Sequence, residues 1–195
     1  MNEEHIIAEL KKQNKQVFAQ LVDMYKNRIF SMAYKYTNDY IESQDLAQEI
    51  FLKVYKEIKG FKGNSKLSTW IYRVGVNTCL DWKRKKSKTK LTSFDVLDEY
   101  LDRMQIEELR DTDKEPERKV IDLEKHKEIH KTIYEMSDIY KNVVIMYHFN
   151  DMSYEEIAEA LDIPKKTVET RLYRARKILK NQLKKLDVEV MKNEV

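Results

Sequence analysis

The sequence predicts an all-α fold: two small helical domains joined by an acidic linker, the second containing a helix-turn-helix. Three observations lead to this prediction. The 195 residues include only 3 glycines and 2 prolines, and the turns of sandwiches, barrels and loop-rich folds depend on those residues. Apolar residues recur at helical spacing through most of the chain. A long acidic stretch without a clean period separates the two periodic parts, which favours two units.

Composition excludes several classes of protein. Charged residues make up 36% of the chain and no apolar run approaches about 18 residues, so no membrane span is expected. The acidic N-terminus lacks the apolar region of a secretory signal. The single cysteine, Cys79, can form no internal disulfide and no zinc site by itself. We expect a cytoplasmic protein without a cofactor or a metal.

The first domain is expected over residues 1–88, with three helical runs. The apolar positions of the first run are Phe18, Leu21, Val22, Tyr25, Ile29, Met32, Ala33 and Tyr36. Asp39 and Glu42 have the spacing of a capping box that opens the second helix, and Gly60 ends it. The third run extends from about Ser68 to Lys86. We expect Gly75, inside that run, to permit close helix packing.

Residues 89–119 form the predicted acidic linker, with a short helix within 96–109. The second domain is expected over 120–187, followed by a tail over 188–195. Ser153 and Glu156 have capping-box spacing, so a helix begins after Ser153. Pro164 suits the start of the next helix. That helix is expected to turn Val168, Leu172, Ala175 and Leu179 inward.

Two short helices at a tight turn, the second longer and basic, are typical of a DNA-binding helix-turn-helix. Charge along the chain agrees with a polyanionic partner. Six positive residues occupy 83–90, and nine occupy 165–185 against one acidic residue, whereas 95–117 holds ten acidic and three basic residues. Two basic blocks on either side of an acidic one suit a polyanion held at two places. The alternative, that each block is a solvated helix face, stays open.

The chain resembles bacterial RNA polymerase sigma factors of the extracytoplasmic-function (ECF) group of the sigma-70 family. Residues 17–59 resemble the opening helices of region two and contain the motif DLAQEIF. Residues 61–86 match the pattern F-x-G-x-S-x-x-x-TW-x-Y-R-I-A-x-N, Pro116-Glu117 resembles the end of the linker, and 134–180 match region four.

The resemblance implies a non-enzymatic initiation factor that binds core RNA polymerase and promoter DNA, takes no small-molecule substrate and answers cell-envelope stress. It also implies a membrane-bound anti-sigma factor, which would hold the chain at the inner face of the membrane. The implied core-binding residues are Asp45, Gln48, Glu49 and Phe51. The implied minus-10 residues are Asn77, which would contact a flipped base, and Lys83, Arg84, Lys85 and Lys86, which would hold phosphates. The implied minus-35 residues are Lys165, Lys166, Thr167, Glu169, Thr170, Arg171, Tyr173 and Arg174.

Some roles stay open on sequence grounds. The aromatic residues Phe61, Trp70, Tyr72 and Trp82 can stack on exposed bases, although core packing is favoured for the two tryptophans. Glu169 cannot hold a phosphate or a guanine, but it can accept a hydrogen bond from a cytosine amino group. The minus-35 sequence therefore stays open.

Two other classes of protein fit less well. A regulator with the same helix-turn-helix would need an α/β receiver or a ligand-binding domain, and residues 1–90 show no strand period. A carboxylate-bridged metal enzyme needs Glu-x-x-His pairs, and no histidine here has a glutamate three positions before it. His126 and His130 lie four residues apart without a further ligand pair, so we expect them at the surface.

Overall fold

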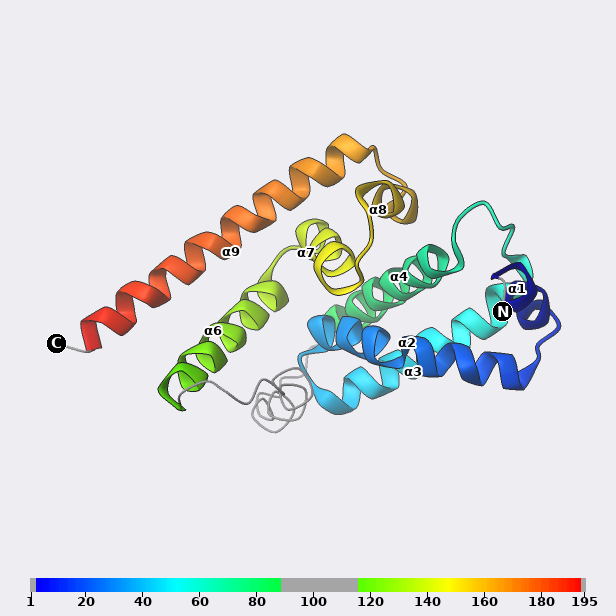
Figure 1. The fold of residues 1–195 in the computed structure, drawn as a ribbon, viewed down its shortest axis with the longest axis horizontal. Coiled ribbons are helices and arrows are strands. Elements are labelled where there is room, and N and C mark those ends of the chain that lie inside the picture. The colour runs from blue at the N-terminus through cyan, green and yellow to red at the C-terminus, as the bar shows by residue number, and fades with distance from the viewer. Residues whose placement is uncertain (1–2, 89–115, 194–195) are drawn as a thin grey trace.

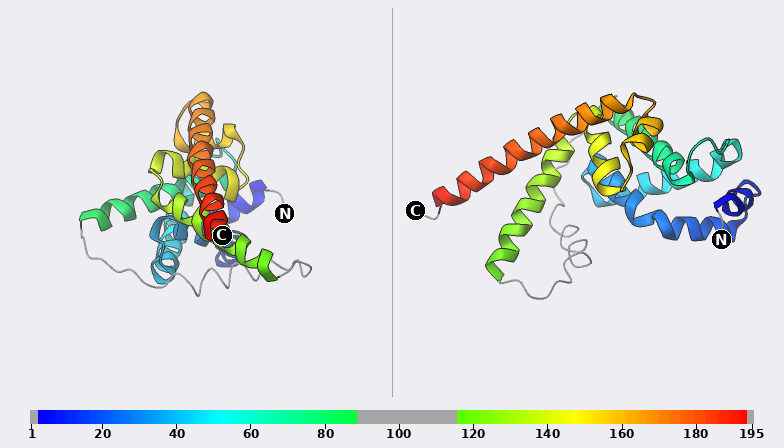
Figure 2. Two further views of the ribbon diagram at one scale, coloured as in Figure 1. Left: turned by 90° about the vertical axis from the view of Figure 1, so that its left-hand side faces the viewer. Right: turned by 45° about the horizontal axis from the view of Figure 1, so that its top comes forward.

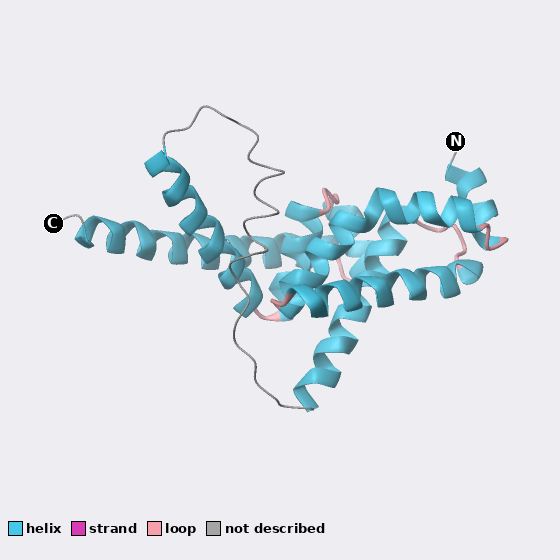
Figure 3. Ribbon diagram, turned by 90° about the horizontal axis from the view of Figure 1, so that it is seen from below, coloured by secondary structure: helices cyan, strands magenta, loops and turns pink. Residues whose placement is uncertain are grey.

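The computed structural model of the chain describes residues 3–88 and 116–193 (Figure 1). Within those ranges the secondary structure is helical throughout, without strands (Figure 3). The first part contains α1 (Glu3–Lys11), α2 (Lys15–Thr37), α3 (Tyr40–Glu57), the short 3₁₀ turn η1 (Ile58–Gly60) and α4 (Leu67–Lys88). The second part contains α6 (Pro116–Glu135), α7 (Asp138–Val144), the π-helical stretch η2 (Ile145–Phe149), α8 (Tyr154–Leu161) and α9 (Lys165–Asn193).

Helix boundaries differ from the prediction in three places. Helix α1 was not predicted. Helix α6 begins at Pro116, inside the predicted linker, and α9 continues to Asn193, beyond the predicted start of the tail. The short helix expected within 96–109 lies outside the described residues. Local capping explains where α2 starts, because the Asn14 side chain accepts hydrogen bonds from the backbone N–H groups of Gln16 and Val17 at 3.0 and 3.4 Å.

At the start of α3, one of the two hydrogen bonds of the predicted capping box forms. The Asp39 carboxylate accepts from the backbone N–H of Glu42 at 2.8 Å. The second bond of the box, from the Asp39 N–H to the Glu42 carboxylate, is replaced by two other contacts. The Asp39 N–H donates to Thr37 Oγ1 at 3.3 Å. The Glu42 carboxylate accepts from Lys86 Nζ at 2.7 Å. The residue that was expected to cap α3 therefore connects α3 to the basic end of α4.

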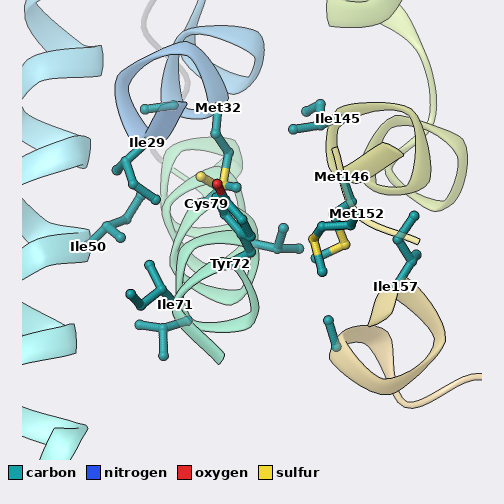
Figure 4. Packing of buried hydrophobic residues seen from close by; sticks show 14 of the residues in the cluster. Ile29, Met32, Ile50, Ile71, Tyr72, Cys79, Ile145, Met146, Met152 and Ile157 are labelled. Atoms are coloured by element: carbon teal, nitrogen blue, oxygen red, sulfur yellow. The ribbon is translucent and has the colours of Figure 1, made fainter. Parts of the chain in front are cut away.

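Gly75 brings α4 close to α2. A Cβ atom at this position would stand 3.0 Å from Met32 Sδ and 3.7 Å from Ile29 Cδ1, which is closer than ordinary van der Waals contact for the sulfur. The expectation that this glycine permits close packing is therefore confirmed. Ile29 and Met32 are fully buried with Ile50 of α3 in the core of the first domain (Figure 4).

The helix-turn-helix forms as predicted. Ser153 and Glu156 make a complete capping box at the start of α8. The turn ends α8 at Asp162, which has φ +53°, and the chain re-enters a helix at Lys165. The predicted inward residues of α9 are buried or half-buried in the core: Val168, Leu172, Ala175 and Leu179. The sequence period and the capping residues therefore agree with the tertiary structure here.

The two domains pack against each other, which the sequence did not predict. Helix α4 lies against α8, and α2 lies against α6 and η2, so the apolar core is continuous across both domains. Met146 and Met152 of the second domain face Tyr72 of α4 (Figure 4). The far ends of α6 and α9 project from this packed body, as two further views show (Figure 2).

Candidate nucleic-acid and polymerase interface

Helix α9 presents polar and charged side chains along the outer side of the helix-turn-helix. Tyr173 is 70% exposed, and Lys165, Lys166, Thr170 and Arg174 are also exposed. The remaining predicted minus-35 residues, Thr167, Glu169 and Arg171, are half-buried. The apolar side of the same helix is held in the core, so the orientation of its outer side is fixed. A second helix held in this way is the geometry that enters a major groove.

Lysines at the start of α9 are partnered locally. Lys166 Nζ lies 3.3 Å from Glu169 Oε2 on the same helix, and Lys165 pairs with Glu155 of α8. The Glu155 partner raises the pKa of Lys165 above its usual value. Glu169 therefore orients a neighbouring lysine, in addition to any contact with a base. The pairing Glu155–Lys165 joins the two helices of the motif across their turn.

Helix α4 carries Asn77 in the middle of an exposed stripe. Arg73, Asn77 and Arg84 are exposed and are spaced by four and seven residues, so they share one helix face. Arg73 was not among the predicted residues, although its spacing from Asn77 is a signal that would have identified it. An amide flanked by guanidinium groups can read a base edge while neighbouring cations hold phosphates.

Most of the basic residues at the end of α4 already have carboxylate partners. Lys83 Nζ lies 2.6 Å from Asp138 Oδ1 of α7, and Lys86 binds Glu42 of α3. Arg84 Nη1 lies 2.7 Å from Asp81 Oδ1 in its own helix. All three cations are partly exposed, so a phosphate can exchange with these carboxylates at small net change in free energy.

Helix α3 carries a second exposed face with mixed chemistry. Asp45 and Gln48 are exposed, and they lie between Ile41 and Leu52, which are 69% and 57% exposed. The four residues follow the helical spacing of one face. The sequence analysis named the two polar residues and missed the two apolar ones, which only their exposure distinguishes from core positions.

Two other predicted core-binding residues are less exposed than this face. Phe51 is half-buried and packs against the apolar core. Glu49 is half-buried, with its carboxylate 3.8 Å from Lys53 Nζ. The structure therefore brings Asp45 and Gln48 together and separates Phe51 from them.

Aromatic residues near α4 are mostly engaged within the fold. Phe61 and Tyr72 are 4% and 1% exposed, which leaves no ring face for a base. Trp70 packs against Phe61 with ring centroids 5.2 Å apart. Trp82 is half-buried, with Lys86 Nζ 4.8 Å from its ring centroid. Core packing, the favoured interpretation of the two tryptophans, matches these contacts.

One histidine differs from the prediction. His126 is exposed as expected, but His130 is largely buried, with its ring 4.8 Å from the ring of Tyr34. Burial, with added repulsion from Lys35 and Lys141, lowers the pKa of His130 to about 3. The prediction failed because the surface that covers His130 belongs to α2 of the other domain, which no helical period reveals.

These features define a class of protein: a two-domain helical DNA-binding factor, with a basic helix in each domain. Comparisons with known proteins agree. The family described as Sigma-70 region 2 matches residues 21–89, and the family described as Sigma-70, region 4 matches 126–179. The chain is 34% identical over 180 residues to "ECF RNA polymerase sigma factor SigW" of Bacillus subtilis, covering 92% of this chain and 96% of the relative. It is 28% identical over 187 residues to "ECF RNA polymerase sigma-E factor" of Haemophilus influenzae, covering 95% and 97%.

Solved structures share the fold. The structure of CnrH in complex with the cytosolic domain of CnrY superposes with a TM-score of 0.66 at 19% identity, covering 93% of this chain and 97% of that one. RpoE of Bartonella quintana in complex with the anti-sigma factor NepR gives 0.64 at 17% identity, covering 86% and 96%.

The chain therefore belongs to the ECF sigma factors of the sigma-70 family. It is an alternative sigma factor, a non-enzymatic protein that directs core RNA polymerase to promoters. Within the described residues, no helix is both long and apolar enough to cross a membrane. The same residues contain no cluster of three potential metal ligands.

Proposed function

We propose that this sigma factor uses three separate surfaces: the α3 face for core polymerase, the α4 stripe for the minus-10 element and the outer side of α9 for the minus-35 element. The single observation that carries the proposal is the exposed face of α3, where two apolar residues flank two polar ones and none of the described residues covers them. DNA-reading surfaces alone would describe any helix-turn-helix protein, whereas this third surface suits a protein partner.

The α3 face has the composition of a protein interface. Ile41 and Leu52 would bury apolar area on docking, worth about 25 cal/mol per Å² removed from water. Between them, Asp45 and Gln48 offer hydrogen-bond acceptors to arginine or lysine side chains of the polymerase. Phe51 supports the helix from the core side, so its contribution is to hold the face in place.

On each of the two DNA surfaces, some residues would contact bases and others would hold phosphates. In α4, Asn77 would read the flipped base, and Arg73, Arg84, Lys85 and the lysines at 83 and 86 would hold phosphates. In α9, Lys165 and Lys166 at the helix start would hold phosphates. Thr167, Thr170, Arg171, Tyr173 and Arg174 would face bases or the backbone nearby. Glu169 would act through Lys166.

We also infer that an anti-sigma factor controls the chain. The solved structures of this fold named above are complexes with CnrY and with the anti-sigma factor NepR. A membrane-bound partner that releases the chain on envelope stress would keep it in the cytoplasm at the membrane face. In cell fractionation, the tagged chain should then move from the membrane pellet to the supernatant after envelope damage. A chain that stays in the supernatant under both conditions contradicts this control.

Reconstituted transcription tests the central proposal. Core polymerase with this chain should give discrete start sites on a library of random upstream sequences, and the selected templates should share two elements. Leu52→Ala should weaken binding to core polymerase, measured by fluorescence anisotropy. Met24→Ala is the matched control, because Met24 on α2 is 61% exposed and Leu52 is 57% exposed. The absence of any discrete start site, or equal weakening by both variants, would contradict the assignment.

A further inference from the structure

Helix α1, which the sequence did not predict, is fixed on the first domain. Leu10 is 2% exposed and belongs to the apolar core, and Ile6 and Ile7 pack against that core. Glu9 Oε2 accepts a hydrogen bond from Asn14 Nδ2 at 2.9 Å, and Asn14 is the residue that caps α2. Helix α1 therefore has a defined position on α2, and its N-terminal turn lies beside the loop between η1 and α4 (Figure 1).

The loop over residues 61–66 is held next to α1 at both of its ends. At the first end, Phe61 is buried in the core and α1 contacts η1. At the second end, Glu3 Oε1 accepts a hydrogen bond from the backbone N–H of Leu67 at 2.6 Å. Between these ends, a groove of about 680 Å³ separates α1 from the loop. A Cβ atom on Gly63 would meet no described heavy atom within 4 Å apart from its chain neighbours. The position of the loop is therefore set at its ends.

The start of α4 depends on this bond from α1. The residue at its N-cap position is Lys66, whose carbonyl accepts the N–H of Trp70 at 3.1 Å. An ammonium group cannot accept a hydrogen bond, so the Lys66 side chain cannot cap the N–H groups that the first turn of a helix leaves without a partner. A carboxylate at this end satisfies one of them and interacts favourably with the helix dipole. Glu3 therefore supplies, from 64 positions away in the sequence, the cap that Lys66 cannot provide.

Lys66 stands at the beginning of the exposed stripe of α4. It is exposed and lies seven, eleven and eighteen residues before Arg73, Asn77 and Arg84, so all four share one helix face. Its Nζ lies 2.8 Å from Glu156 Oε1 of α8, and its side chain is 69% exposed. A phosphate can therefore exchange with this carboxylate at small net change in free energy. The stripe gains a cation at its N-terminal end, opposite the basic residues at 83–86.

We propose that α1 is a positioning element of the minus-10 surface: Glu3 fixes the first turn of α4, and this places Lys66 to hold a phosphate of the minus-10 DNA. The inference rests on the proposed function for the location of the minus-10 surface on α4. It goes beyond that function by adding a phosphate-holding residue and the residue that positions it. Glu3 acts through the backbone at Leu67 and does not itself contact the DNA, because a carboxylate and a phosphate repel each other.

Amide hydrogen exchange of the free full-length chain, measured by NMR, tests the cap without polymerase or DNA. Glu3→Ala should raise the exchange rate of the Leu67 amide about fivefold, the factor that corresponds to the loss of an N-cap. Glu3→Gln should raise it less, because the amide oxygen of glutamine can accept the same bond. Glu4→Ala is the matched control, since Glu4 is exposed and lines the same groove. An unchanged rate in Glu3→Ala, or the same rise in Glu4→Ala, would overturn the proposal.

Binding of minus-10 oligonucleotides in the presence of core polymerase, measured over a range of salt concentrations, tests the role of Lys66. Lys66→Gln should weaken binding and reduce the salt slope by about one phosphate. Lys12→Gln is the matched control, because Lys12 also lies 2.8 Å from a glutamate and its side chain is 72% exposed. It should leave the slope unchanged.

The same assay separates a positioning role of Glu3 from a general loss of structure. Glu3→Ala should weaken minus-10 binding severalfold, Glu3→Gln should restore most of it, and neither variant should change binding to minus-35 duplexes. Minus-10 binding by Glu3→Ala equal to that of the wild type would overturn the proposal, as would an equal loss at both elements or an unchanged slope with Lys66→Gln. A failure of the proposed function would appear separately, as no minus-10 preference in the wild type while the Leu67 amide still responds to Glu3→Ala.

Discussion

The basic residues of α4 and α9 differ in where their partners lie. On α9, Lys166 pairs with Glu169 of the same helix, and Lys165 pairs across the turn with α8. On α4, Lys86 pairs with α3, and Lys83 pairs with Asp138 of the other domain. The two α9 lysines therefore have partners within the helix-turn-helix, whereas the partner of Lys83 on α4 depends on the position of the second domain. Two helices with similar numbers of basic residues thus differ in whether their ion pairs depend on the other domain.

The largest effect on stability is expected from a substitution in the core of the helix-turn-helix. Leu172 is fully buried at the centre of the helix-turn-helix, so Leu172→Ala should reduce the free energy of unfolding by about 2–5 kcal/mol. Urea denaturation followed by circular dichroism measures this loss. A loss below about 1 kcal/mol would show that the motif does not depend on this contact.

On α4, substitutions of a base-contacting residue and of a phosphate-contacting residue should affect DNA binding differently. Asn77→Ala should reduce preference at one minus-10 base by about 1–3 kcal/mol. Arg84→Ala should weaken binding uniformly across sequences and lower the salt dependence. Competition binding to single-stranded minus-10 oligonucleotides, in the presence of core polymerase, distinguishes them. Uniform weakening by Asn77→Ala would give that residue a packing role.

The coupling between domains should appear in the pH dependence of stability. His130 faces Tyr34 and Lys35 of α2 and Lys141 of α7, and its pKa of about 3 lies below the ordinary 6.5. Between those values the unfolded chain binds a proton that the folded chain does not, so stability falls as the pH decreases below about 6.5. From pH 7 to pH 5 this contribution is about 2 kcal/mol.

Variants isolate this titration from that of the carboxylates. Chemical denaturation at pH 7 and pH 5 should show a smaller loss for His130→Phe than for the wild type. His126→Gln, four residues earlier and exposed, should leave the loss unchanged. Equal losses in all three proteins would mean that His130 is hydrated, and that the domains are apart in solution.

The smallest effect is expected at the local ion pair of α9. Lys166 and Glu169 are 87% and 39% exposed, so Glu169→Gln should change stability by only a few tenths of a kcal/mol. Because this variant releases Lys166, duplex binding should strengthen slightly at low salt, as measured by fluorescence anisotropy. Weaker binding instead would mean that Glu169 itself contacts the DNA.

Most of the helices, the capping box at Ser153 and the close approach at Gly75 follow from the sequence, because short-range period and backbone preferences specify them. It also identified Asp45, Gln48 and Asn77, whose place on exposed faces the structure shows. Only the tertiary structure shows that His130 is largely buried and that Ile41 and Leu52 are exposed. It also decided that Lys83 pairs across the domains. Burial and ion pairing between segments far apart in the chain depend on which surfaces meet, and a helical period specifies only which side of each helix is apolar.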